Sequence, residues 1–164
     1  MEPVRTAHEL YAHAIAMERE AAERYGEFAQ RMADLGNDGI AAVFAKLGAM
    51  EAEHLRTLEN RTQGVSIPDV KPDQYRWLDA GPPETAAREL IYRLMTPRRA
   101  LAIALDAEMR AKAFFEHVYR TARDPALRAL AQEMAMEEKE HVALVALQLE
   151  RTPEADGDAQ RSRL

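Results

Sequence analysis

The sequence contains no cysteine. This absence excludes disulfide bonds, thiol catalysis, iron–sulfur clusters and every metal site that depends on a cysteine ligand. Any metal ion that the chain binds must therefore be held by carboxylates and imidazoles.

Residues that break helices or favour strands are also few. The 164 residues include only seven glycines and eight prolines, and aromatic residues make up 6% of the chain. Alanine, leucine and methionine are plentiful, whereas β-branched residues are sparse. This composition favours an all-α fold, and the length suits one domain with a substantial core.

Long apolar runs and an excess of basic residues are missing too. Purely apolar runs such as Ala100 to Leu105 are far shorter than the ~20 residues that span a membrane. The net charge is −6, so nucleic acid is not an expected partner. The first residues lack the apolar block of a signal peptide, so we expect a cytoplasmic protein without a membrane partner.

Helix caps mark two long periodic segments in the first part of the chain. Thr6 begins a Thr-x-x-Glu capping box, and apolar residues then recur at helical spacing until Gly36. Asn37 or Asp38 can cap a second helix, which Gly64 ends. The loop between the two is so short that they must form an antiparallel hairpin.

The second half repeats this arrangement. Thr96-Pro97 and Asp124-Pro125 each combine an N-cap residue with proline at the first helical position. The helices that they begin are predicted to end near Ala122 and Arg151. Residues 1–151 are therefore predicted to form one bundle domain, and residues 152–164 a polar, disordered tail.

More than 30 residues connect the two hairpins. Prolines interrupt residues 64–96, and a short helix is expected from about Glu84 to Met95. A helix of ~24 residues is ~36 Å long, which takes at least ~11 residues of extended chain to cross. The connection is thus long enough to return the chain to the opposite end of the bundle. Two antiparallel hairpins joined by one such crossover form a ferritin-like four-helix bundle.

Two Glu-x-x-His motifs lie on the apolar faces of the second and fourth predicted helices. They are Glu51-x-x-His54 and Glu138-x-x-His141. Residues three apart share one helical face, so each pair points in one direction. A single motif of this kind arises easily by chance, but two at equivalent positions are typical of a metal site.

The first and third predicted helices each place one glutamate on an apolar stripe. These residues are Glu18 and Glu108. An aromatic residue follows each of them after seven positions, Tyr25 in the first hairpin and Phe115 in the second. Each hairpin thus supplies one lone acid and one Glu-x-x-His motif. Tyr25 is expected to pack in the core with its hydroxyl near the site, where it can serve in hydrogen bonding or redox chemistry.

Four carboxylates inside one bundle need compensating charge. Each buried carboxylate would cost several kcal/mol, and the four would repel one another. No lysine or arginine lies on the four stripes. Two divalent cations would balance four glutamates and two neutral histidines, and this oxygen-rich ligand set suits iron or manganese, with zinc as a substitute. His8, His13 and His117 have no glutamate three residues before them, so we expect them to be exposed or half-buried.

At these motifs the chain resembles the ferritin-like superfamily and, within it, the rubrerythrin family, over about residues 6–150. The resemblance implies two iron ions. It makes Glu18 and Glu108 terminal ligands, makes Glu51 and Glu138 bridging ligands, and gives each ion one histidine, His54 or His141. Peroxide-reducing members carry a rubredoxin domain with four cysteines, which is lacking here, and a further glutamate where this chain has Ala111. The site is therefore expected to be more symmetric, as in ferritin.

These observations predict a di-iron oxidoreductase that oxidises Fe(II) while it reduces O₂ or H₂O₂, as in defence against oxidative stress. Without cysteine ligands of its own, the protein would take electrons from an external donor or from free Fe(II). The resemblance implies a homodimer. Two alternatives remain open at this point: iron sequestration with little turnover, and a structural bundle whose acids are protonated or hold adventitious zinc.

Overall fold

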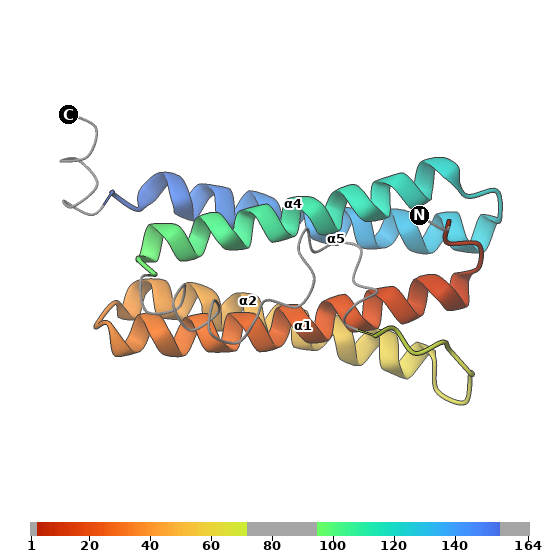
Figure 1. The fold of residues 1–164 in the computed structure, drawn as a ribbon, viewed down its shortest axis with the longest axis horizontal. Helices are drawn as coiled ribbons and strands as arrows, with labels where there is room; N and C mark the ends of the chain where they lie inside the picture. Colours follow the sequence, from red (N-terminus) through yellow and green to blue (C-terminus); the bar gives the residue numbers. More distant parts are fainter. Residues whose placement is uncertain (1–2, 72–94, 155–164) are drawn as a thin grey trace.

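The computed structural model describes residues 3–71 and 95–154. These residues form four long helices and no strand (Figure 1), so the all-α prediction is confirmed. The helices are α1 (Ala7–Asp34), α2 (Asp38–Arg61), α4 (Pro97–Thr121) and α5 (Pro125–Arg151). The short helix expected near residues 84–95 lies outside the described residues except for Met95, as do residues 155–164 of the predicted tail.

The predicted caps begin all four helices. Side-chain oxygens of Thr6, Asn37, Thr96 and Asp124 each accept the backbone N–H three residues later, at 2.7–3.2 Å. A cap of this kind stabilises a helix by about 1 kcal/mol. Gly36 and Gly64 follow the ends of α1 and α2 with φ near +74° and +73°, which glycine adopts at no steric cost.

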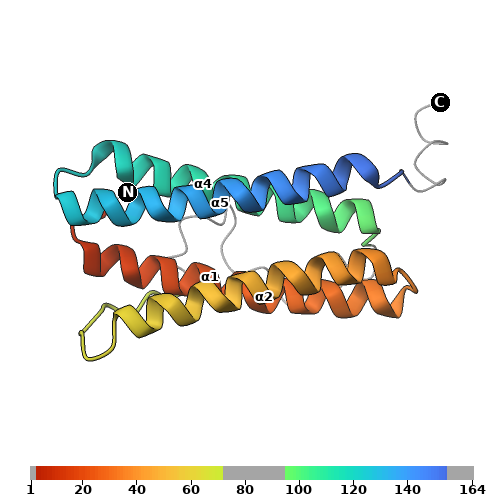
Figure 2. The same ribbon diagram turned by 180° about the vertical axis from the view of Figure 1, so that it is seen from behind.

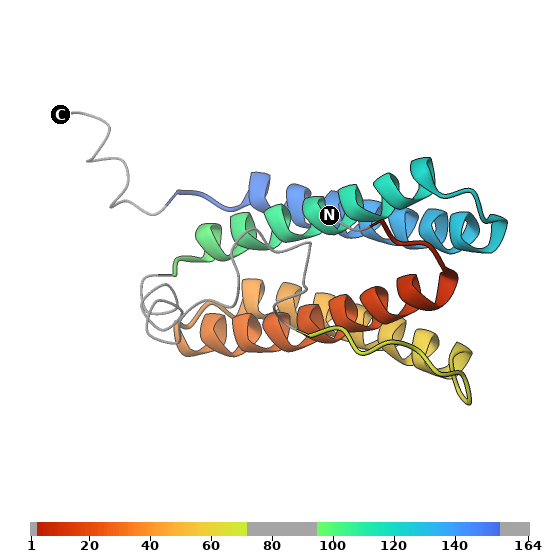
Figure 3. The same cartoon turned by 45° about the vertical axis from the view of Figure 1, so that its right-hand side comes forward.

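The four helices form two antiparallel hairpins, α1 with α2 and α4 with α5 (Figures 1 and 2). The end of α2 and the start of α4 lie at opposite ends of the bundle. Figure 3 shows the hairpins as two layers, and close approaches between the layers are far fewer than within them. This is the predicted ferritin-like arrangement. None of the described helices is long and apolar enough to cross a membrane.

Two apolar clusters fill the ends of the bundle and leave a polar layer between them. One cluster contains Leu10, Leu58, Phe115 and Leu127. The other, towards the opposite end, contains Phe28, Phe44, Leu101 and Val145 among others. On every helix the residues of the two clusters flank the predicted ligand positions. The clusters therefore close the middle layer off from solvent at both ends.

One histidine prediction is wrong. His8 and His117 are exposed as expected, but His13 is buried, with its ring 5.6 Å from that of Phe114. The lack of an acid three residues earlier correctly set His13 apart from the ligand motifs. The lack of this acid does not predict whether the histidine is exposed, because a histidine on the apolar stripe of α1 can pack against an aromatic ring without binding a metal.

Candidate metal centre

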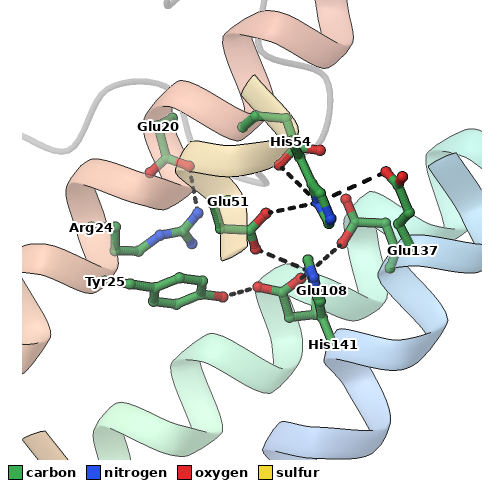
Figure 4. Close-up of polar contacts among 10 residues, drawn as sticks. Glu20, Arg24, Tyr25, Glu51, His54, Glu108, Glu137 and His141 are labelled. Carbon is green, nitrogen blue, oxygen red and sulfur yellow. Dashed lines mark hydrogen bonds and ion pairs between the residues drawn. The ribbon is translucent and has the colours of Figure 1, made fainter. Parts of the chain in front are cut away.

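Each of the four helices points one glutamate into the middle layer. Glu18, Glu51, Glu108 and Glu138 are only 1–4% exposed and come from α1, α2, α4 and α5. Figure 4 shows Glu51 and Glu108 turned towards each other and towards the two histidines. These acids lie on the same helical stripes as large apolar residues. The apolar residues determine which face of each helix turns inward, so the acids become buried with them. The structure thus brings together the four acids that the sequence singles out.

The two histidines face these carboxylates. His141 Nδ1 lies 3.0 Å from Glu51 Oε1, 3.5 Å from Glu108 Oε2 and 3.6 Å from Glu138 Oε2. His54 Nδ1 lies 3.9 Å from an oxygen of Glu18 and 3.9 Å from Glu51 Oε2. The two imidazoles are nearly parallel, with an interplanar angle of 10° and centroids 5.2 Å apart. The two oxygens of Glu51 therefore face different histidines.

Within the described residues, three groups of side chains each place their donor atoms close enough to hold one cation. Within each group the donor atoms all lie within 4.8 Å of one another. The groups are Glu108 with Glu138 and His141, Glu51 with His54 and His141, and Glu18 with His54 and Glu137. The first and third groups have no residue in common, so the layer offers two separate sets of ligands.

Several buried polar atoms in this layer have no hydrogen-bond partner among residues 3–71 and 95–154. They are Glu18 Oε1, Glu138 Oε2, His54 Nδ1 and both ring nitrogens of His141. Leaving such an atom unpaired costs about 1–3 kcal/mol, so this concentration of unpaired donors and acceptors needs a reason. Carboxylate and imidazole atoms that converge without partners are the arrangement that a bound metal ion satisfies.

Lysine and arginine side chains of the described residues do not compensate the four acids. Among residues 3–71 and 95–154, no lysine or arginine forms an ion pair with any of them. Arg24 lies nearby on α1, but its guanidinium is engaged with Glu20 (Figure 4). The charge balance of the described layer therefore depends on protons or on bound cations.

Without cations the layer binds protons. Burial raises the pKa values of Glu18 and Glu138 well above the ordinary 4.5. Burial alone would raise the pKa of Glu51 too, but the nearness of His141 and Glu18 lowers it. Burial alone would lower the pKa of His141, yet the surrounding carboxylates of Glu108, Glu138 and Glu51 raise it far above 6.5. Metal ions that bind here must displace these protons.

We expect the stability of the metal-free protein to fall as the pH rises above about 5. Folded Glu18 and Glu138 keep protons above pH 4.5 that the unfolded chain has released, and His141 adds the same effect above pH 6.5. Each such proton lowers the free energy of unfolding by about 1.4 kcal/mol per pH unit. The lowered pKa of Glu51 acts below pH 4.5 and does not oppose this trend. Thermal unfolding in EDTA from pH 5.5 to 8 measures it; a constant or rising Tm would contradict it.

Tyr25 links the two hairpins at the site. Its side chain is fully buried, and its hydroxyl donates a hydrogen bond to Glu108 Oε1 on α4 (Figure 4). The ring packs against Phe44, with centroids 5.9 Å apart. Tyr25 thus combines core packing with a bond to a candidate ligand. Its counterpart in the repeat, Phe115, has no hydroxyl to donate.

Sequence reasoning did not single out Glu137. This residue lies on α5, one position before Glu138, and its Oε2 is 3.8 Å from His54 Nδ1 (Figure 4). Its side chain is 31% exposed, which places it at the margin of the layer. A signal was available: Glu137 follows buried Met134 by three residues and precedes His141 by four, so it borders the buried stripe.

A small pocket between α1 and α4 leads to the carboxylates. Its apolar lining consists of Met17, Ala21, Ala107 and Ala111, and Glu20 and Arg24 also line it. Glu18, Glu51, Glu108 and Glu138 form its polar lining. Ala111 thus borders open space and offers no ligand atom.

Comparisons with known proteins agree with this arrangement. The sequence model of the Rubrerythrin family matches residues 9–91. The fold is similar to the crystal structure of an uncharacterised conserved protein from Magnetospirillum magnetotacticum MS-1, with a TM-score of 0.80 and 34% identity over 92% of this chain and 98% of that one. No curated protein sequence matches the chain. With its four-helix bundle and its layer of glutamates and histidines, the chain belongs to the rubrerythrin family of ferritin-like proteins.

Proposed function

We propose that the protein is a di-iron oxidoreductase that oxidises Fe(II) while it reduces O₂ or H₂O₂. The observation that carries this proposal is the convergence of four buried glutamates and two histidines from four helices, in a layer whose two ends are closed by apolar clusters. Oxygen-rich ligation with one imidazole per ion suits iron, with manganese as the alternative and zinc as a substitute. The ligand set is also the one described for di-iron carboxylate bundles.

The proposed ligands follow the geometry of the layer. Glu18 and His54 would hold one ion, and Glu108 and His141 the other. Glu51 is suited to bridge the two, because its oxygens face His54 and His141 separately. By likeness to the family, Glu138 would be the second bridge. Six ligands from four helices would then satisfy the unpaired buried atoms.

A bound pair of iron ions would supply the electrons that reduce the oxidant. The residues of the chain prepare the site for this chemistry. The apolar clusters exclude bulk water, and the pocket lined by Ala107 and Ala111 suits an oxidant of two heavy atoms. Tyr25 orients Glu108 through its hydroxyl, while Glu18 and Glu138 take up protons when cations leave. Electrons for repeated turnover would come from an external donor or from the Fe(II) substrate, in a cytoplasmic homodimer.

An anaerobic titration with Fe(II) tests this proposal. We expect two iron ions to bind per chain, and addition of O₂ or H₂O₂ to produce Fe(III) and a new absorption band in the near ultraviolet. Protein loaded with zinc is the control, because zinc has no accessible redox change. A stoichiometry well below two, with no oxidation after the oxidant is added, would refute the proposal.

Iron sequestration with little turnover is the second candidate. It is favoured by the lack of cysteine, since the chain carries no rubredoxin-type electron relay of its own. Measurement of peroxide or oxygen consumption in the presence of a reductant separates the two candidates. Sustained consumption over many turnovers would exclude pure storage.

A further inference from the structure

We propose that Glu137 is a further carboxylate ligand for the ion held by Glu18 and His54, so that the two ions occupy unequal sites. We call Glu18, His54 and Glu137 the outer site, and Glu108, Glu138 and His141 the inner site. The outer site is the half-exposed one and releases its ion first. This inference rests on the proposed function only in requiring that two divalent ions bind.

The geometry of the outer site supports a ligand role for Glu137. Its three side chains come from α1, α2 and α5, and their donor atoms lie within 4.8 Å of one another. His54 Nδ1 is as near to Glu137 Oε2, at 3.8 Å, as to the oxygens of Glu18 and Glu51, at 3.9 Å. Glu137 therefore completes a three-ligand set from which the inner-site residues are absent.

Unpaired buried atoms point to a ligand at this set. Glu18 is 2% exposed, and its Oε1 has no hydrogen-bond partner. His54 Nδ1 is likewise buried and unpaired, and it faces the same carboxylates. In the inner site, by contrast, Tyr25 donates a hydrogen bond to Glu108. In the described part of the chain no such hydroxyl donates a hydrogen bond to Glu18 Oε1.

Cationic side chains do not explain the position of Glu137. The ion pair of Glu137 within the described residues is with His54 alone. Arg61 lies in the same region, but it pairs with Glu133, one turn earlier on α5, at 2.7 Å. Among residues 3–71 and 95–154, Glu137 thus faces the layer without an ion pair to lysine or arginine.

The sequence repeat between the two hairpins shows that only the second hairpin has an acid at this position. Glu51 and Glu138 are equivalent, so the counterpart of Glu137 is Met50, whose thioether is a poor ligand for a hard cation. The two sites also differ in burial, and the outer site is the more exposed one. The side chains of His54 and Glu137 are 24% and 31% exposed, whereas that of His141 is 1% exposed. The sequence predicts a symmetric site because Ala111 on α4 adds no ligand. Under this proposal Glu137 on α5 makes the two sites unequal.

Glu137→Gln tests the inference, since it removes the charge and keeps the shape. Glu140→Gln is the matched control, because Glu140 is exposed on the same helix. The probe is Fe(II) under anaerobic conditions, titrated against a competing chelator, with the bound ions counted per chain. We expect the wild-type protein and Glu140→Gln to bind two ions. Glu137→Gln should keep one tight ion and bind the second at least about tenfold more weakly.

Glu137→Asp, which keeps a shorter carboxylate, should weaken the second ion less than Glu137→Gln does. Equal binding of both ions by Glu137→Gln and the wild type would overturn the inference and leave the proposed function intact. Equal weakening of both ions would also overturn it, because Glu137 would then not belong to one site. A wild-type protein that binds no iron would refute the proposed function itself.

Discussion

Replacement of Glu138 by leucine is expected to abolish tight binding of at least one metal ion and, at the same time, to stabilise the metal-free protein. Glu138 is 4% exposed, its Oε2 has no hydrogen-bond partner, and burial raises its pKa. It also faces the carboxylates of Glu108 and Glu51, which repel it when charged. Leucine removes this buried carboxyl group, and its repulsion with the neighbouring carboxylates, at similar volume.

The gain in stability should be large enough to measure. Replacing buried charged groups by apolar residues of similar volume is often neutral or stabilises proteins by about 1–4 kcal/mol. For a chain of this size each kcal/mol raises Tm by about 2–4 °C. Thermal unfolding in EDTA measures the gain, and metal analysis measures the loss of the ion. Glu140→Leu is the control and should change neither quantity by much. A Glu138→Leu protein that is less stable and still binds two ions would contradict our account of the layer.

Removal of metal from the loaded wild-type protein should have the largest effect on its stability. A ligand whose free concentration is about 1,000 times its dissociation constant stabilises the folded state by about 4 kcal/mol, so two ions contribute about 8 kcal/mol. We therefore expect EDTA to lower Tm by roughly 15–30 °C at neutral pH. Circular dichroism at 222 nm during heating, with and without a stoichiometric excess of Fe(II) or Mn(II), measures the difference.

Glu138→Leu provides the internal control for this experiment. Its Tm should respond much less to EDTA, because at least one of its sites is lost. If EDTA left the Tm of the wild-type protein unchanged, bound ions would contribute nothing to folding. The structural alternative, in which protonated acids fill the layer, would then be favoured over both iron hypotheses.

The helices and the inward position of the four glutamates could be predicted because local signals specify them. Each helix begins at a side chain that caps it, and such caps depend only on neighbours three residues away. Glu18 and Glu108 stood out because each interrupts an apolar stripe, and a stripe defines the inward face of a helix before its partners are known.

Features at the margins of the stripes, and between hairpins, could not be predicted in this way. Glu137 and His13 lie where burial depends on how closely a neighbouring helix approaches, which the sequence of one helix does not report. The bond from Tyr25 to Glu108 joins residues 83 positions apart on different hairpins. Its partner is selected by the packing of the two layers and not by spacing along the chain.

The division of the bundle into two hairpins gives bound ions a mechanical role. Within a hairpin the helices pack closely, whereas close approaches between the hairpins are few. The outer site draws ligands from α1 and α2 of one hairpin and from α5 of the other. The inner site lies on α4 and α5, and Glu51 would connect it to the first hairpin. The ions would act as reversible cross-links between the two hairpins. The chain has no cysteine that could form a permanent one. Release of iron would then weaken the contact between the two hairpins first. Each hairpin would stay folded after that contact has opened.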